Sequence, residues 1–265
     1  MWVPYIIKIK KNTIMKTISN MIINGFIAGL LLLAGSCTKE TSELAANPIF
    51  ELLKVADDGT TLLVNSNLGA CLTEDFTFSD DELEILLHMK EEEKLAGDVY
   101  TFLYELWGTP VFLNISKAEE THKNAVLYLI EAYGDEYTLT GEAGVFENPD
   151  FQALYSQLVQ KGSESLEAAM ETGALIEEMD IKDLEEALTV VENENIKIVF
   201  ENLLRGSRNH LRAFNRQLNN LGVTYAPVYI SQESFDQIVS TPNETGSGNQ
   251  KNNQFRKGRQ YRGGR

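Results

Sequence analysis

From residue 79 onward, apolar residues recur along the chain with the spacing of amphipathic helices. In the first such segment one helical face carries an apolar stripe made of Leu86, Met89, Ala96, Tyr100, Leu103 and Trp107. The segment opens with Ser79-Asp-Asp-Glu82, a capping box in which the serine and glutamate oxygens each accept a helix-start amide. Gly108-Thr-Pro110 follows the stripe and stops a helix. We therefore predict a first helix over residues 79–107.

A second helix is predicted over residues 116–133. Ser116-Lys-Ala-Glu119 is again a capping box, and Gly134 follows the last apolar position. The glycine-rich crossover that comes next contains Asn148-Pro149, which places Asn at the cap and Pro in the first turn of a short helix.

Two further long helices are predicted over residues 165–190 and 195–221, and Gly222 ends the second of them. The four long helices are joined by a short, a long and a short connection. The predicted fold class is therefore all-α, a four-helix bundle with one long crossover connection, over residues 79–227.

The flanking segments are expected to carry little structure. Residues 37–78 look like a tether with a short helix over residues 48–56, and residues 228–265 like a flexible basic tail. From residue 240 the chain has almost no aliphatic side chains, so it cannot bury enough apolar surface to fold. The Arg/Gly composition of this tail could attract polyanions, although a solvated end is the plainer interpretation.

The charge of the chain is unevenly distributed. The first 36 residues carry four Lys and no acid, and residues 241–265 carry six Lys or Arg and one Glu, which leaves a net charge near -25 between them. A folded domain with this negative charge repels nucleic acid and anionic lipid and attracts cations. No nucleic-acid partner is therefore expected for the folded domain.

Residues 1–36 have the layout of an export signal. Basic residues as far as Lys16 precede an apolar run over residues 21–34, which at fourteen residues is too short to span a bilayer comfortably. Met15 begins a stretch that is typical of a signal start, so the true start of the protein is placed there as an alternative to Met1.

The small residues in Ala34-Gly-Ser-Cys37 resemble a bacterial lipobox, which implies that Cys37 is the lipidated first residue of a mature envelope lipoprotein. Ala34 departs from that pattern, where Leu is usual, so a cleaved signal and a soluble periplasmic or secreted protein are the alternative. If Cys37 is lipidated, Cys71 is the only free thiol of the chain, and a Cys37–Cys71 disulfide in an oxidising compartment is the alternative.

Acidic and imidazole side chains interrupt the apolar stripes. Glu93 occupies a stripe position in the first helix, and Glu119 and His122 precede the apolar positions of the second. A buried carboxylate without a partner is too costly to keep, so it must be neutral, paired or bound to a metal. Glu119 also has a plainer role as the last member of its capping box, and either histidine could be a hydrogen-bonded core residue.

The third and fourth helices repeat this arrangement imperfectly, with Glu177 in one and Ser207-x-x-His210 in the other. Residues three apart on a helix share a face, so a Glu can bridge two ions while its His binds one of them. Two Glu and two Glu-x-x-His motifs from four helices make the site of di-iron and di-manganese carboxylate bundles. The candidate metal ligands are Glu93, Glu119, His122, Glu177 and His210, and the ions expected are iron or manganese, or zinc.

Ser207 stands where such a site has Glu, so the number of ions, one or two, stays open. Glu92 and Glu178 are expected on solvated faces, and each could supply the oxygen that Ser207 lacks. His88, four residues before Glu92, is interpreted as a surface residue. Tyr100, one or two turns from the first candidate ligand, is a core residue that could line a metal pocket.

The motif Glu93-x-x-Ala96-x-x-x-Tyr100, followed by Glu119-x-x-His122, resembles the first half of rubrerythrin and other ferritin-like proteins. Three longer stretches are more closely similar to domain-of-unknown-function family 2202, namely LLHMKEEEKLAGDVYTFLYELWGTPVF, GALIEEMDIKDLEEAL and ENLLRGSRNHLRAF. The resemblance covers about residues 80–227. It implies a ferritin-like fold with a candidate metal site and assigns no reaction.

Two functions follow from these patterns. The first is an exported, lipid-anchored ferritin-like bundle that binds one or two transition-metal ions and reacts with dioxygen or peroxide, or handles metal. The second is a non-enzymatic helical envelope lipoprotein that acts as a binding or structural module. A homo-oligomer is compatible with either. Metal storage would need a cage or many sites, and nothing in one chain shows a cage.

The lipid anchor predicts the behaviour of a Cys37→Ser variant. Without the thiol no lipid can be attached, so the variant is expected to move from the membrane fraction to the soluble fraction. Immunoblotting of fractionated cells measures this, with Cys71→Ser as the matched control. Retention of both variants in the membrane fraction would contradict lipidation at Cys37.

Overall fold

The computed structural model describes residues 53–55, 61–63, 77–134 and 141–244. All of them belong to one of two compact units of the chain, Ala46–Arg265, and the other unit, Met1–Ala45, lies outside the described residues. The predicted export signal, the predicted lipidation site Cys37, the second cysteine Cys71 and the tail from residue 245 also lie outside them.

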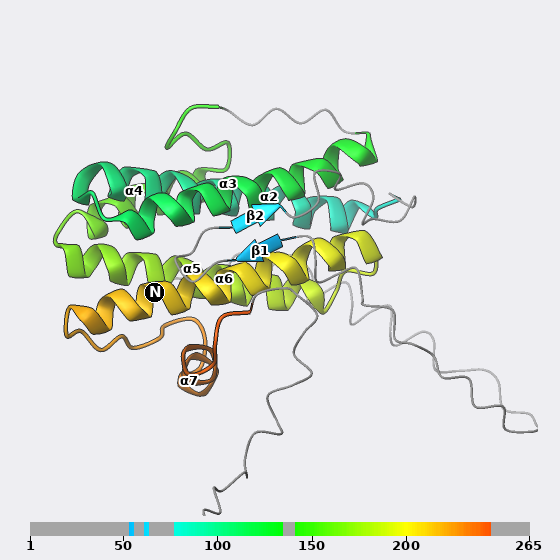
Figure 1. The fold of residues 1–265 in the computed structure, drawn as a ribbon. Helices are drawn as coiled ribbons and strands as arrows, with labels where there is room; N and C mark the ends of the chain where they lie inside the picture. The colour runs from blue at the N-terminus through cyan, green and yellow to red at the C-terminus, as the bar shows by residue number, and fades with distance from the viewer. Residues whose placement is uncertain (1–52, 56–60, 64–76, 135–140, 245–265) are drawn as a thin grey trace, which may run out of the picture. The chain divides into compact units, whose positions relative to one another are not determined.

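The described part of the chain is dominated by helices (Figure 1). They are α2 (Asp80–Trp107), α3 (Pro110–Tyr133), α4 (Pro149–Gly162), α5 (Leu166–Leu188), α6 (Glu194–Asn220) and α7 (Gln232–Ser240). The predicted all-α class is confirmed. None of these helices combines the length and the apolar composition that crossing a membrane would require.

The four long helices contact one another in a closed cycle. α2 packs along α3 and α5 along α6, while α3 also contacts α6 and α2 also contacts α5. The connection between α3 and α5 is the long crossover, and its helix α4 contacts both α2 and α5. This order of a short, a long and a short connection is the predicted one.

Packing of aromatic and aliphatic side chains fills the space between the four helices. Tyr100, Phe112 and Phe214, from three different helices, form a buried cluster with ring centroids 5.3 to 6.4 Å apart. Gly173 lies against this cluster, because a Cβ at that position would come within 2.4 Å of the Phe214 ring. Burial of this apolar surface is the main favourable term that holds the helices together.

α2 begins and ends where the sequence predicted. Ser79 accepts the amide of Glu82, and the Glu82 carboxylate accepts the amide of Ser79, which completes the predicted capping box. Gly108 follows Trp107 with a φ of 65°, a left-handed conformation that glycine adopts without a Cβ clash.

The predicted start of the second helix is wrong by six residues. α3 begins at Pro110, directly after the Gly108 turn, because the fixed φ of proline suits the first helical position. Ser116 is therefore an interior residue whose hydroxyl donates to the Leu113 carbonyl at 3.0 Å, and Ser116-Lys-Ala-Glu119 is no capping box. The carboxylate of Glu119 is consequently free of a capping role.

The segment over residues 228–244 is ordered, so the predicted flexible tail is wrong there. Phe235 and Ile238, three residues apart on α7, are buried, and the Ile238 carbonyl accepts from Arg212 Nε at 2.8 Å. The Glu244 carboxylate forms ion pairs with Arg208 and Arg212 on α6. The basic composition of the last residues hid this short amphipathic pattern.

A short hairpin replaces the end of the helix predicted over residues 48–56. β1 (Leu53–Val55) pairs antiparallel with β2 (Thr61–Leu63), with Leu53 opposite Leu63. The sequence Asp57-Asp-Gly59 between them is a hairpin signal that outweighed the weak helical pattern. Residues 48–52 of the predicted helix lie outside the described ones.

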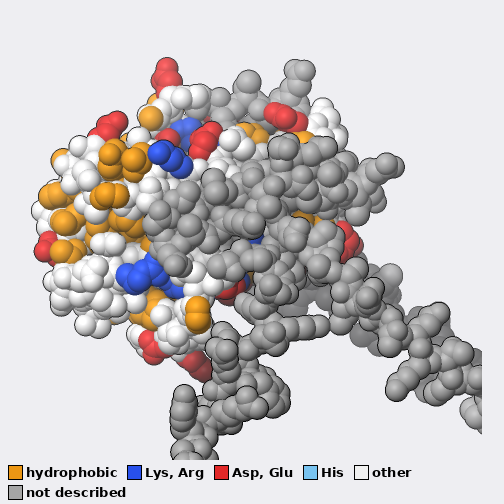
Figure 2. Space-filling view, in the orientation of Figure 1, with side chains coloured by type: hydrophobic (Ala, Val, Ile, Leu, Met, Phe, Trp, Pro, Cys, Tyr) orange, Lys and Arg blue, Asp and Glu red, His pale blue; other side chains and the backbone are white. Residues whose placement is uncertain are grey.

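Acidic side chains are unusually common in the interior. On the face that Figure 2 shows, Asp and Glu side chains are dispersed among hydrophobic and uncharged atoms. Nine acidic side chains are buried within the described part of the chain: Glu82, Glu91, Glu92, Glu93, Glu119, Glu177, Glu178, Asp180 and Asp183. Such residues are rarely buried without partners, so each needs a physical explanation.

Hydrogen bonds from three backbone amides explain how the Glu82 carboxylate can be buried. One oxygen accepts from Ser79 N at 2.9 Å, and the other accepts from Glu192 N at 2.9 Å and Asn193 N at 2.8 Å. Burial raises the pKa of Glu82, but the hydrogen bonds from Ser79, Asn193 and Glu192 outweigh it and lower that pKa below its ordinary value. The ionised carboxylate thus ties the start of α2 to the turn before α6.

Replacement of Glu82 by Gln is expected to lower the free energy of unfolding at neutral pH by about 1–3 kcal/mol, because the amide nitrogen of Gln cannot accept a hydrogen bond. The folded-state pKa is lowered, so the carboxylate stabilises fully above its unfolded-state pKa. That contribution is lost as the pH falls through the folded-state pKa. The difference between wild type and Glu82→Gln should therefore shrink in acid.

Urea denaturation across a pH series measures this difference. Glu84→Gln is the matched control, because Glu84 is exposed on the same helix. An equal loss of stability in both variants, or a difference that does not change in acid, would argue against the amide-bound carboxylate.

Candidate metal centre

The five predicted ligands lie together between the four long helices. Glu93 comes from α2, Glu119 and His122 from α3, Glu177 from α5 and His210 from α6. Each of these residues is at most 2% exposed to solvent. The structure thus brings carboxylates and imidazoles from all four helices into one dry cluster, which we call the central cluster.

Glu119 occupies the middle of the central cluster. Its Oε2 lies 2.8 Å from His122 Nδ1, and its Oε1 lies 2.9 Å from His210 Nδ1. Glu93 Oε2 approaches the same nitrogen of His122 at 3.3 Å, and Glu177 Oε2 approaches that of His210 at 3.5 Å. Each imidazole nitrogen therefore faces two carboxylates, of which Glu119 is shared.

These close approaches are ion pairs when the imidazoles are protonated, and none has the geometry of a hydrogen bond. Neither ring nitrogen of His122 or His210 makes a hydrogen bond of acceptable geometry with a described residue, and the same holds for Glu93 Oε1 and Glu119 Oε1. Each buried polar atom left without a partner costs about 1–3 kcal/mol. Nitrogen and oxygen atoms that converge without hydrogen bonds form a donor set suited to a metal ion.

Gly206 on α6 makes room for the His122 ring. A Cβ at position 206 would lie 2.6 Å from His122 Cε1 and 2.7 Å from Nε2. The imidazole can therefore lie against the α6 backbone while its Nδ1 faces the carboxylates. Gly97 on α2 is different, because a Cβ there would lie 3.6 Å from the Glu119 Cβ, an ordinary contact.

Asp180 is a buried acid beside the central cluster that the sequence analysis missed. Its Oδ2 accepts a hydrogen bond from the Ser207 hydroxyl, while its Oδ1 has no hydrogen-bond partner among the described residues. The signal was present, because Asp180 follows Glu177 at the same three-residue spacing that relates Glu119 to His122.

Ser207 is tied to this acid. Its Oγ also lies 3.0 Å from the Leu203 carbonyl. Where the predicted pattern lacked a Glu on α6, the structure places Asp180 of α5 as a further carboxylate.

Glu178 and Glu92 were predicted on solvated faces, and both are buried. Glu178 Oε2 accepts the amides of Val228, Tyr229 and Ile230 at 2.7 to 3.2 Å, so it holds the segment after α6 and does not join the central cluster. Glu92 faces a separate group of side chains. Neither residue supplies the oxygen that Ser207 lacks.

Tyr100 positions one of the candidate ligands. Its hydroxyl donates to Glu177 Oε1 and also lies 3.3 Å from the Gly173 carbonyl. Burial and the Glu177 carboxylate raise the pKa of Tyr100 well above its ordinary value, so the phenol keeps its proton. Glu177 Oε2 is thereby turned towards His210.

Protons and imidazolium charges balance the acids when no cation is bound. Burial raises the pKa of Glu119, but the His210 and His122 imidazoliums outweigh it and hold that pKa below its ordinary value. Burial and Glu119 raise the pKa of Glu177 to about 7, and burial and Glu177 raise that of Asp180 to about 8. Burial lowers the pKa of His210, but Glu119 and Glu177 raise it to about 10. A bound cation would displace such protons.

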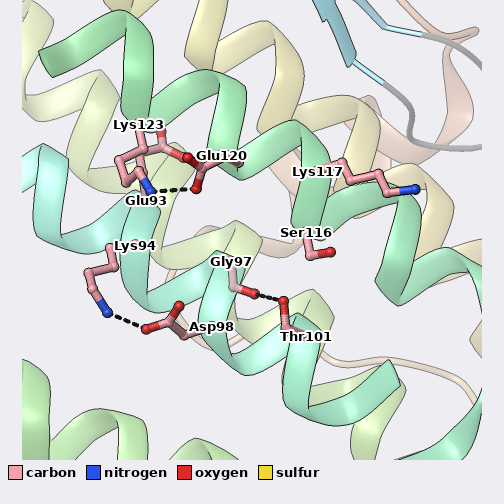
Figure 3. Close-up of a pocket in the computed structure, with 9 residues that line it drawn as sticks. All are labelled: Glu93, Lys94, Gly97, Asp98, Thr101, Ser116, Lys117, Glu120 and Lys123. Atoms are coloured by element: carbon pink, nitrogen blue, oxygen red, sulfur yellow. Dashed lines mark hydrogen bonds and ion pairs between the residues drawn. The ribbon is translucent and has the colours of Figure 1, made fainter. Parts of the chain in front are cut away.

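A partly open pocket of about 210 Å³ between α2 and α3 reaches the central cluster at Glu93 (Figure 3). Its lining is polar, and Gly97 leaves space in the wall. Lys94 pairs with Asp98 and Lys123 with Glu120, so two of its cations are neutralised locally. The pocket gives small solutes a route to one ligand of the cluster.

Comparison with known proteins finds relatives over the helical region. A family model described as "Uncharacterized protein domain (DUF2202)" matches residues 82–242. Uncharacterized protein MJ0754 of Methanocaldococcus jannaschii is 49% identical over 169 residues, which are 63% of this chain and 91% of that protein. The crystal structure of hypothetical protein MJ0754 from Methanococcus jannaschii matches with a TM-score of 0.62 at 48% identity, over 63% of this chain and 96% of that one.

The close approach of His122 to α6 predicts opposite effects of alanine at two helical glycines. Gly206→Ala should lower the free energy of unfolding by about 1–3 kcal/mol, because the new Cβ overlaps the imidazole. Gly97→Ala should be neutral or stabilise by up to about 1 kcal/mol, because alanine favours the helix and meets no close atom. Urea denaturation of both variants measures the difference. Equal stabilities would contradict the placement of the His122 ring.

Proposed function

This chain belongs to the DUF2202 family of uncharacterized protein domains. From its site we propose that it is a ferritin-like metal protein, and from its N-terminal sequence that it is exported. Glu93, Glu119, His122, Glu177 and His210 bind one or two transition-metal ions. The observation that carries this proposal is the position of Glu119, whose two oxygens each lie within 2.9 Å of a different imidazole nitrogen without a hydrogen bond to either.

The donor set favours iron or manganese, with zinc as the third candidate. Imidazole nitrogen suits transition metals, carboxylate oxygen suits iron and manganese, and the central cluster offers no thiolate. The carboxylates of Glu93, Glu119, Glu177 and Asp180 beside two neutral imidazoles carry four negative charges, which two divalent ions would neutralise. Charge balance therefore supports two ions, and Glu119, which approaches both imidazoles, would contribute to holding them.

Bound iron or manganese would supply redox chemistry with dioxygen or peroxide, or would itself be the ion that the protein handles. The chain contributes a dry interior that excludes bulk water and fixes the ligands on four helices. The Tyr100 hydroxyl holds Glu177 in position, and Gly206 admits the His122 ring. Small solutes reach Glu93 through the pocket between α2 and α3.

Export and the lipid anchor at Cys37 are part of the proposal and are supported by the signal layout of residues 1–36 alone. An anchored metal protein would work at the bacterial envelope. The non-enzymatic alternative keeps the same anchor and fold, so metal content decides between the two.

Metal analysis of protein purified without chelator tests the proposal. The His122→Ala/His210→Ala double variant should contain at least one iron, manganese or zinc ion per chain fewer than wild type, because it lacks both imidazole ligands. Asn124→Ala/Asn219→Ala is the control, because both asparagines are exposed on the same two helices.

Circular dichroism verifies that all three proteins are folded. Equal metal content in wild type and the His double variant would remove the central site and favour the non-enzymatic alternative. If metal is lost, absorption spectra of iron-loaded wild type after addition of dioxygen or peroxide then test turnover.

A further inference from the structure

We propose a second cation site, outside the central cluster, formed by His88 and Glu92 of α2 and Asp183 of α5. It takes a divalent transition-metal ion that accepts mixed nitrogen and oxygen ligands, such as zinc. The proposal does not depend on the central cluster holding a metal, because the two sites share no ligand.

The three side chains converge without hydrogen bonding to one another. His88 Nε2 lies 3.8 Å from Glu92 Oε2 and 3.9 Å from Asp183 Oδ2, and the three ligand atoms lie within 4.8 Å of one another. These separations exceed a hydrogen bond. Ligand atoms about 2.1 Å from a tetrahedral zinc ion would be about 3.4 Å apart, so His88 Nε2 is about half an ångström further from each carboxylate oxygen than zinc ligation requires.

An unpartnered oxygen of Glu92 is separate evidence that a cation binds between these three side chains. Its side chain is 5% exposed, and its Oε2, the atom that faces His88, has no hydrogen-bond partner among the described residues. Glu178, which is also buried, accepts three backbone amides with its Oε2, and among the described residues its Oε1 has no imidazole ion pair to suggest a metal ligand set. An unpaired buried carboxylate oxygen is costly, and a cation between Glu92, His88 and Asp183 would satisfy it.

The surroundings of this second site also suit a metal that exchanges with solution. The His88 ring packs against Phe151 of α4 with centroids 4.9 Å apart, which fixes its direction. The His88 and Asp183 side chains are 17% and 12% exposed, so water can reach the site and complete the coordination. The side chains of the second site are therefore more exposed than those of the central cluster, which are at most 2% exposed.

The two sites lie on different sides of α2, because consecutive residues of a helix point in different directions. Glu92 and Glu93 point about 100° apart around α2, so one faces His88 and the other faces His122. Asp183 lies one turn beyond Asp180 on α5, and the two acids have different partners: Asp180 pairs with Ser207, whereas Asp183 approaches His88.

Zinc binding to four proteins tests the proposal. Wild type and His88→Ala are compared by equilibrium dialysis against zinc, followed by metal analysis, and the same comparison is repeated in the His122→Ala/His210→Ala background. His88→Ala should bind one zinc ion per chain fewer in both backgrounds. Unchanged zinc content on removal of His88 in both backgrounds would overturn the second site, whatever happens at the central one.

A conservative variant guards against misfolding. Asp183→Asn keeps the side-chain shape and should weaken zinc binding at this site at least about tenfold, since it removes a charged ligand. Glu185→Gln removes the same charge from an exposed position of α5 and should leave zinc binding unchanged. Equal affinities in both variants, measured by calorimetric titration, would contradict ligation by Asp183.

Discussion

Charge in a dry interior is the constraint on which this structure depends. A carboxylate removed from water has to be hydrogen-bonded, protonated, paired or bound to a cation, and the space between α2, α3, α5 and α6 contains several of them beside two imidazoles. α2, α3 and α5 contribute the carboxylates, and α3 and α6 contribute the imidazoles, so the helices must keep their register for these groups to meet. Aromatic packing brings the helices together, and the acids determine how precisely they have to align.

The molecule satisfies its buried acids in different ways, and the differences are informative. Glu82 and Glu178 accept backbone amides at the ends of helices, and Glu244 pairs with two arginines. Both oxygens of Glu82 and of Glu244 have partners, whereas only Oε2 of Glu178 has them and its Oε1 has none among the described residues. Glu93 and Glu119 have only imidazoles and other acids near their unpartnered oxygens. A metal ion is therefore the partner that we propose for these two carboxylates.

The sequence was most informative where one residue determines one local event. Ser79 and Glu82 predicted the start of α2, and acids in apolar stripes predicted which side chains would meet inside. It was least informative where two signals competed, as at Ser116, whose capping pattern lost to Pro110. The burial of Glu92 and Glu178 depends on what other segments place opposite them, which helical periodicity along one segment cannot show.

The two halves of the central cluster are unequal. His122 and both of its carboxylate neighbours belong to the hairpin of α2 and α3, whereas His210 draws on α3, α5 and α6. A single hairpin with a tight Gly108 turn thus assembles one coordination position locally, and the other exists only after the two hairpins have docked. For the two-ion site proposed above, occupancy would consequently be ordered: the first ion could enter a half-assembled protein, and the second would report that assembly is complete.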